Sequence, residues 1–114
     1  MDFTGKIALV TGGASGIGKA TVMDLARNGA RVICADINET TGRALVEEAK
    51  RSGLEVEYDA VDLTDSASVR RCVADVTARH PKIDVLVNAA GFSVFHPFLE
   101  TPPDYLDKVI AGNL

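Results

Sequence analysis

An uncharged apolar run that leads into a glycine-rich turn and then a helix is the feature that most constrains this chain. Residues 7–10, IALV, carry no charge, which is typical of a strand buried on both faces of a parallel sheet. A turn with Gly12, Gly16 and Gly18 follows. Up to Gly29, apolar residues recur at helical spacing, at Ile17, Ala20, Leu25 and Ala26. The stretch therefore predicts a strand, a tight turn and a helix.

Such a turn can bind a phosphate group. The first amides of a helix have no partner inside it and lie at the positive end of its dipole. Glycine lets a ligand approach these amides closely and permits positive φ in the turn. The stretch therefore predicts a diphosphate site.

A second kind of phosphate loop also fits part of this stretch. Residues 13–19, GASGIGK, match the G-x-x-x-x-G-K pattern of the P-loop nucleotide triphosphatases. That loop needs Ser or Thr directly after the lysine to hold magnesium, and this chain has Ala20 there. Nucleotide triphosphatase activity is therefore the less favoured alternative, with Lys19 interpreted as a solvated helix residue.

An acidic residue follows the second apolar run. Residues 30–35 form that run, and Asp36 comes directly after it. In a dinucleotide-binding unit, a carboxylate at the end of the second strand, about 20 residues beyond the glycines, accepts hydrogen bonds from the adenosine ribose. The alternative is that Asp36 only caps the helix that follows.

Strands and helices alternate through the rest of this region. The pattern predicts a helix at 38–52, an outer strand at 54–61, a helix at 66–80 and a strand at 83–87. In the helix at 66–80, Val69, Val73 and Val76 are the expected packing stripe. His80 is expected at the end of that helix, without a chemical role.

The glycine turn also carries a resemblance to a known family. Residues 11–18, TGGASGIG, match the T-G-x-x-x-G-I-G pattern of the short-chain dehydrogenase/reductase family, in its single-domain branch. Further matches are Asp62-Leu63, residues 88–91 (NAAG) and Asn113-Leu114, so the resemblance runs from about residue 6 to residue 114. It implies an α/β fold that is Rossmann-like, with three layers (α/β/α) and a partial doubly wound parallel sheet in strand order 3-2-1-4. Residues 1–114 would be a single partial NAD(P)-binding domain, βαβαβαβα, truncated before its second half.

The resemblance implies which residues contact the cofactor. They are Gly12, Ala14, Ser15, Gly16, Ile17, Gly18, Asp36, Ile37, Asp62, Leu63, Asn88, Ala89, Ala90 and Gly91. Asp62 would accept a hydrogen bond from the adenine amino group, although Asp62, Thr64 or Asp65 could equally start the next helix. Ala89 replaces the second asparagine of the family's N-N-A-G and removes one polar contact. Asn88 could tie neighbouring strand ends together.

The same resemblance favours NAD over NADP as the cofactor. A carboxylate at Asp36 repels the additional phosphate of NADP. Relatives that prefer NADP often carry a base where this chain has Ser15 and Ile37. Neither cysteine shows metal-ligand spacing, and no metal is expected.

Asn113 is the single catalytic residue that the resemblance assigns. The serine, tyrosine and lysine that complete the family's set would follow it, and the sequence ends at Leu114. Tyr105 and Lys108 are not a substitute, because their spacing is three and they precede Asn113. We therefore expect an oxidoreductase that transfers hydride between NAD(H) and a secondary alcohol or ketone when complete, and an inactive chain on its own. A non-catalytic dinucleotide-binding module or a truncated product is the alternative.

Charge and composition limit the partners and the location. The net charge is -4 and the bases are scattered, which leaves no basic face for nucleic acid. The N-terminus lacks a secretory pattern and no apolar run reaches membrane-spanning length, so a cytoplasmic protein without a membrane partner is expected. Cys34 and Cys72 are expected to be buried thiols. The apolar strand at 83–87 would be a sheet edge, and we expect it to pair with another copy in a homo-oligomer.

Overall fold

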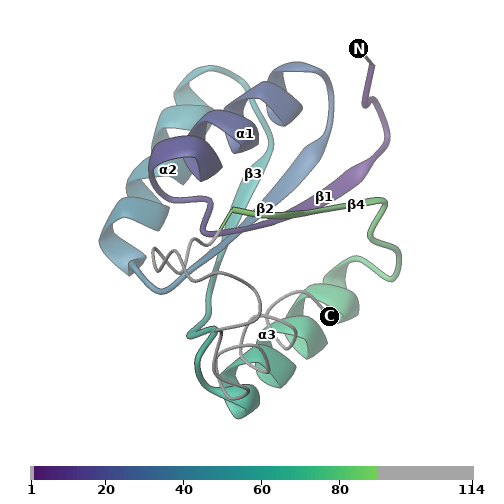
Figure 1. Ribbon diagram of the computed structural model, residues 1–114. Helices are drawn as coiled ribbons and strands as arrows, with labels where there is room; N and C mark the ends of the chain where they lie inside the picture. Colours follow the sequence, from purple (N-terminus) through teal and green to yellow (C-terminus); the bar gives the residue numbers. More distant parts are fainter. Residues whose placement is uncertain (1, 90–114) are drawn as a thin grey trace, which may run out of the picture.

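The computed structural model of this protein describes residues 2–89, which form a sheet with helices between its strands (Figure 1). Along the chain the elements are β1 (Ile7–Thr11), α1 (Gly16–Arg27), β2 (Arg31–Asp36), α2 (Glu39–Arg51), β3 (Val56–Ala60), α3 (Ser66–Arg79) and β4 (Val85–Asn88). Their ends differ from the predicted ones by no more than about two residues, which is ordinary for element ends. Ala90, Gly91, Asn113 and the last helix of the expected βαβαβαβα order lie outside the described residues.

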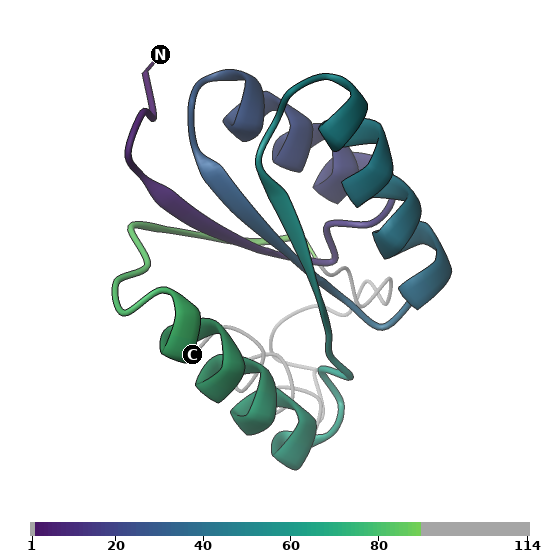
Figure 2. The same ribbon diagram turned by 180° about the vertical axis from the view of Figure 1, so that it is seen from behind.

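The sheet has the predicted topology. Its strands are parallel and lie in the order β3-β2-β1-β4. Helices α1 and α2 cover one face and α3 lies on the other, as the two opposite views show (Figure 2). Parallel neighbours need a crossover connection, and each helix supplies one. The predicted Rossmann-like three-layer fold with strand order 3-2-1-4 is therefore confirmed.

Two apolar clusters fill the spaces between the sheet and its helices. The cluster beneath α1 and α2 includes Val10, Val22 and Leu45. The cluster beneath α3 includes Ile33 and Val76. Strand β2 lies between β1 and β3, with a layer of helices on each side, and its residues 32–35 are all buried. A strand covered on both faces needs apolar residues at consecutive positions, which explains the uninterrupted run in the sequence.

Some residues that recur at apolar helical spacing lie at the surface. On α1, Ile17 is 82% exposed and Ala20 is also exposed. The buried stripe of α1 includes Gly18, which a pattern of apolar side chains does not reveal. On α3, Val73 is 41% exposed, while its neighbour Cys72 is buried in the core. The expected packing role of Val73 was wrong, because apolar spacing alone does not settle which way a helix is rotated on a sheet.

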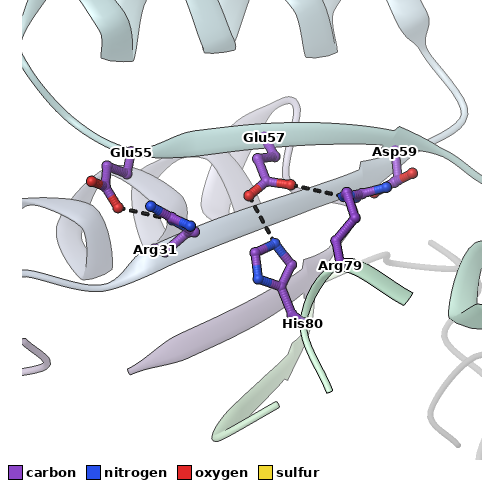
Figure 3. Close-up of polar contacts among 6 residues, drawn as sticks. All are labelled: Arg31, Glu55, Glu57, Asp59, Arg79 and His80. Atoms are coloured by element: carbon purple, nitrogen blue, oxygen red, sulfur yellow. Dashed lines mark hydrogen bonds and ion pairs between the residues drawn. The ribbon is translucent and has the colours of Figure 1, made fainter. Parts of the chain in front are cut away.

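Polar contacts attach the end of α3 to the edge strand β3 (Figure 3). His80 Nε2 lies 2.8 Å from Glu57 Oε2, and Arg79 Nε lies 3.1 Å from Glu57 Oε1. Arg79 also pairs with Asp59 on the same strand. His80 ends α3 as predicted, and only 8% of it is exposed. Its ring therefore has a structural role, which the sequence did not reveal.

Strand β4 is an edge of the described sheet. It pairs only with β1 within residues 2–89, and Leu86 on it is 48% exposed. An apolar strand with an open edge can pair with another chain. The expected self-association through this strand stays a prediction.

Both cysteines are buried, which leads to a prediction about their reactivity. Burial raises the pKa of the Cys34 thiol to about 12 and that of the Cys72 thiol to about 11. A cysteine in an unfolded chain has a pKa of about 8.5, so at pH 8 the folded protein should react with a thiol reagent at least about 100-fold more slowly than the denatured protein. Titration with a chromogenic disulfide, with and without urea, measures this difference.

The same pKa shifts predict how stability depends on pH. Keeping both thiols protonated contributes stability that is complete below about pH 8.5 and is lost as the pH rises through the raised pKa values. Urea unfolding should therefore show lower stability at pH 11 than at pH 8.

In the experiment with the thiol reagent, rapid reaction of a thiol in the folded protein at pH 8 would contradict the burial of these side chains.

Candidate functional site

The glycine-rich turn joins β1 to α1 and leaves the start of that helix open. Ser15 is the N-cap residue, but its side chain makes no capping hydrogen bond. In contrast, side-chain oxygens of Asn38 and Asp65 accept hydrogen bonds at the starts of α2 and α3. The first amides of α1 therefore remain available to a ligand acceptor.

Gly18 lets the turn pack directly on the first turn of α1. A Cβ atom added at Gly18 would lie 1.9 Å from the carbonyl oxygen of Gly12 and 2.7 Å from its carbonyl carbon. Both contacts are to backbone, so a side chain could fit only if the turn moved. Gly12 itself has a φ of 69°, a conformation that favours glycine. The spacing of glycines in the sequence thus reflects the geometry of this turn.

Asp36 lies at the end of β2 and is held on several sides. One carboxylate oxygen accepts a hydrogen bond from the amide of Ala14 at 3.1 Å, and the other accepts one from the amide of Asn38 at 2.9 Å. The N-cap of α2 is Asn38, whose side chain accepts from the amide of Thr41. Asp36 is therefore not the N-cap of α2. Instead, it connects the end of β2 to the glycine-rich turn.

Asp62 and Leu63 follow the carboxyl end of β3, at the same edge of the sheet as Asp36. Asp62 Oδ1 accepts hydrogen bonds from the amide of Thr64 at 2.9 Å and from its hydroxyl at 2.6 Å. The N-cap of α3 is Asp65, so Asp62 does not cap that helix. The amide of Asp62 donates to Ser68 Oγ at 2.9 Å, which fixes the loop against α3. The structure thus decides among the three residues that could have started the helix.

Asn88 ties two strand ends together, as predicted. The hydroxyl of Thr11 donates to Asn88 Oδ1 at 2.6 Å, and the amide of Ala89 donates to the carbonyl oxygen of Thr11 at 2.9 Å. These contacts align the carboxyl ends of β1 and β4. Parallel strands place such ends at one edge of the sheet, where ligands bind in folds of this kind.

A pocket of about 320 Å³ lies at this edge. The segments that follow β1, β2, β3 and β4 all contribute to it. Its lining residues are Gly12, Ser15, Ala35, Asp36, Ile37, Val61, Asp62, Leu63, Thr64 and Ala89. The structure therefore brings the glycine turn together with the predicted ribose and adenine residues. Of the other predicted contacts, Ala14, Gly16, Ile17, Gly18 and Asn88 are described but do not line this pocket.

The ion pair that Lys19 makes does not support a role in phosphate binding. Its Nζ lies 3.0 Å from Glu48 Oε2, which links α1 to α2. A P-loop lysine must instead reach the phosphates. The contact supports a helix-surface role for Lys19 and counts against nucleotide triphosphatase activity.

Comparison with known proteins decides the family. A family model described as short chain dehydrogenase matches residues 6–114. The chain belongs to the short-chain dehydrogenase family. The predicted resemblance is thus confirmed, and the family relationship covers almost the whole chain.

Individual relatives of the short-chain dehydrogenase family cover the chain from end to end. A sorbitol dehydrogenase of Cereibacter sphaeroides is 40% identical over 114 residues, which is 100% of this chain and 43% of the relative. An NAD-dependent glycerol dehydrogenase of Listeria innocua is 34% identical over 113 residues. That match covers 99% of this chain and 43% of the relative. The chain thus spans somewhat less than half the length of these curated relatives.

A solved structure gives the same answer about the fold. The chain is similar to one described as a Pseudomonas aeruginosa RhlG/NADP active-site complex, with a TM-score of 0.74 and 31% identity. The match covers 79% of this chain and 36% of that one. Short-chain dehydrogenase relatives thus include one named for NAD and one solved with NADP.

The part of the chain that the structure describes contains no candidate metal site and no helix that could span a membrane. In residues 2–89 no group of three or more His, Cys, Asp or Glu side chains could hold a metal ion. No helix in this part of the chain combines the length and apolar character needed to cross a bilayer.

Proposed function

We propose that this chain binds NAD(H) and forms the cofactor-binding part of an NAD-dependent oxidoreductase. The observation that carries the proposal is the pocket in which the glycine-rich turn, Asp36 and the Asp62-Leu63 loop meet. The membership of the chain in the short-chain dehydrogenase family supports the reaction class. The proposed substrates of the whole protein are a secondary alcohol and its ketone.

The residues around the pocket fit a dinucleotide. The open start of α1 supplies amides for a diphosphate, and Gly18 leaves no side chain between the turn and the helix. Asp36 supplies a carboxylate for the ribose hydroxyls next to that turn. Leu63 and Ile37 line the pocket beside Asp62, where an adenine ring would need an apolar surface and a polar partner.

The chain's own contribution is to bind and orient the cofactor. When bound, the nicotinamide cofactor supplies the chemistry of hydride transfer. The amides at the start of α1 would fix the diphosphate, and Asp36 would fix the sugar. Asn113, outside the described residues, is the proposed catalytic residue of this chain, and Ala90 and Gly91 are proposed cofactor contacts.

The preference for NAD over NADP rests on charge. A phosphate on the 2′-hydroxyl of the ribose would meet the Asp36 carboxylate, which repels it. The pocket lining offers no lysine or arginine to offset that repulsion among the described residues. We therefore propose NAD as the cofactor.

Replacing Asp36 with alanine tests the proposal. The unmodified chain should bind NADH at least about 10-fold more tightly than NADPH. Asp36→Ala should weaken NADH binding by about 10- to 100-fold, because hydrogen bonds to a charged group contribute about 1.5–3 kcal/mol. It should not weaken NADPH binding as much, because the repulsion is also removed. Fluorescence titration with each nucleotide gives both dissociation constants.

The ratio of the two dissociation constants is the decisive quantity. Asp36 also holds the amide of Ala14, so a loosened turn would weaken both nucleotides equally. Asp75→Ala, which removes an exposed carboxylate of α3 outside the pocket lining, is the matched control and should leave the ratio unchanged. Failure of the unmodified chain to bind either nucleotide would overturn the proposed function.

A cytoplasmic location and a homo-oligomer stay predictions, as does a single partial NAD(P)-binding domain at residues 1–114. The catalytic activity belongs to the whole protein under this proposal, since the chain spans 43% of the sorbitol dehydrogenase relative.

A further inference from the structure

Tyr58 on β3 contacts the backbone of Asp36 from beneath α2. Its hydroxyl donates a hydrogen bond to the carbonyl oxygen of Asp36 at 2.8 Å. The amide of Val61 donates to the same oxygen at 3.2 Å. Tyr58 is half-buried, and it lies opposite Cys34 in the strand register, two residues before Asp36. The hydroxyl thus reaches along β2 to the residue that we assign to the ribose.

Helix α2 has a glycine, Gly42, where the Tyr58 ring packs against it. A Cβ atom added at Gly42 would lie 2.3 Å from both Cδ1 and Cε1 of Tyr58. A glycine inside a helix lowers its stability relative to alanine, so its presence here needs a reason. The close approach of the Tyr58 ring supplies that reason. The guanidinium of Arg43 lies 5.8 Å from the centre of the same ring.

The hydroxyl of Tyr58 is a dependable donor. Burial raises the pKa of the phenol, and the charge of the Asp36 carboxylate raises it further. The proton therefore stays on the oxygen at neutral pH. The Asp36 carbonyl has two lone pairs, so Tyr58 and the amide of Val61 can both donate to it.

Hydrogen bonds thus hold both the backbone carbonyl and the side-chain carboxylate of Asp36. Its carbonyl oxygen is fixed by Tyr58 and Val61, and its carboxylate is held by the amides of Ala14 and Asn38. Each carboxylate oxygen keeps a lone pair for a ribose hydroxyl, because an ionised carboxyl accepts about four hydrogen bonds. The direction of the carboxylate in the pocket depends on the backbone that Tyr58 holds.

We propose that Tyr58 is a positioning residue for cofactor choice, which holds the Asp36 backbone so that its carboxylate meets the ribose and excludes a 2′-phosphate. Gly42 is part of the same arrangement because it makes room for the ring. This inference rests on the proposed function, in which Asp36 selects NAD. It predicts that a residue outside the pocket lining sets the ratio of the affinities for NADPH and NADH.

Tyr58→Phe tests the inference because it removes the hydroxyl and keeps the ring. We expect the preference for NADH over NADPH to fall by about 3- to 10-fold, the effect of losing one hydrogen bond. Gly42→Ala should reduce the preference in the same direction, because its new methyl group would displace the ring. Arg43→Gln, which removes the cation beside the ring and leaves the hydroxyl, should leave the preference unchanged.

The outcomes separate this inference from the proposed function. A preference that Asp36→Ala abolishes and Tyr58→Phe leaves unchanged would overturn the role of Tyr58 and leave the NAD proposal intact. An equal loss of affinity for both nucleotides in Tyr58→Phe, with a lowered melting temperature, would show a purely structural role and would also overturn it. If the unmodified chain binds neither nucleotide, the inference is wrong together with the function on which it rests.

Discussion

A chain carrying Gly18→Ala is expected to lose NADH affinity by about 100-fold, because the added methyl group would force the glycine-rich turn out of place. The new Cβ would lie 1.9 Å from the carbonyl oxygen of Gly12, and a backbone atom cannot yield as a flexible side chain can. Such overpacking costs about 1–3 kcal/mol even where the surroundings relax. Both NADH titration and thermal unfolding should show the effect.

A second glycine provides the control for this experiment. Gly53 follows α2, has a φ of 72° and has no atom within 4 Å of an added Cβ. Gly53→Ala should lower stability by about 1–2 kcal/mol through backbone strain alone, with no effect on NADH affinity. The explanation fails if Gly18→Ala binds NADH as tightly as Gly53→Ala does.

Ile33→Ala should lower the free energy of unfolding by about 2–5 kcal/mol, the usual range for an isoleucine truncated in a core. Ile33 is 0% exposed and packs with Val61, Cys72 and Val76 between β2 and α3. Domains of this size are stable by only about 5–15 kcal/mol, so the change would remove a large share of the total. Urea denaturation followed by circular dichroism measures it.

Ile33→Val is the matched control for the core prediction. It removes a single methyl group from the same position and should cost about 0.5–1.5 kcal/mol. Equal destabilisation by the two variants would mean that the loss does not scale with the volume removed. In that case Ile33 would not lie in a closely packed core.

The succession of strands and helices could be predicted because its signals are local, whereas the strand order came from the resemblance to the family. A buried parallel strand leaves an uninterrupted apolar run, as at residues 7–10, and a tight strand-to-helix turn requires glycine. Asp36 could be placed near the turn because it follows the second strand, and the carboxyl ends of neighbouring parallel strands meet at one edge of the sheet. Neither inference needed knowledge of how the helices pack.

The rotation of the helices and the support of the site needed the folded chain. Ile17 and Val73 fit an apolar spacing and yet are exposed. Which side of a helix is buried depends on how the helix packs against the sheet, and the spacing alone does not show this. From the sequence, Tyr58 was only one residue of a predicted outer strand, and no pattern linked it to Asp36 or to Gly42. His80 similarly looked like a simple helix end, while its partner Glu57 lies on another element.

The sequence by itself thus determined the succession of strands and helices and the glycine turn, because each depends on residues close together along the chain, and the motif in that turn indicated the family and with it the strand order. The tertiary structure decided which groups hold Asp36 in place. Those groups are brought together from β1, α2 and β3 only when the sheet forms, and contacts between separate elements leave no periodic signal in the sequence.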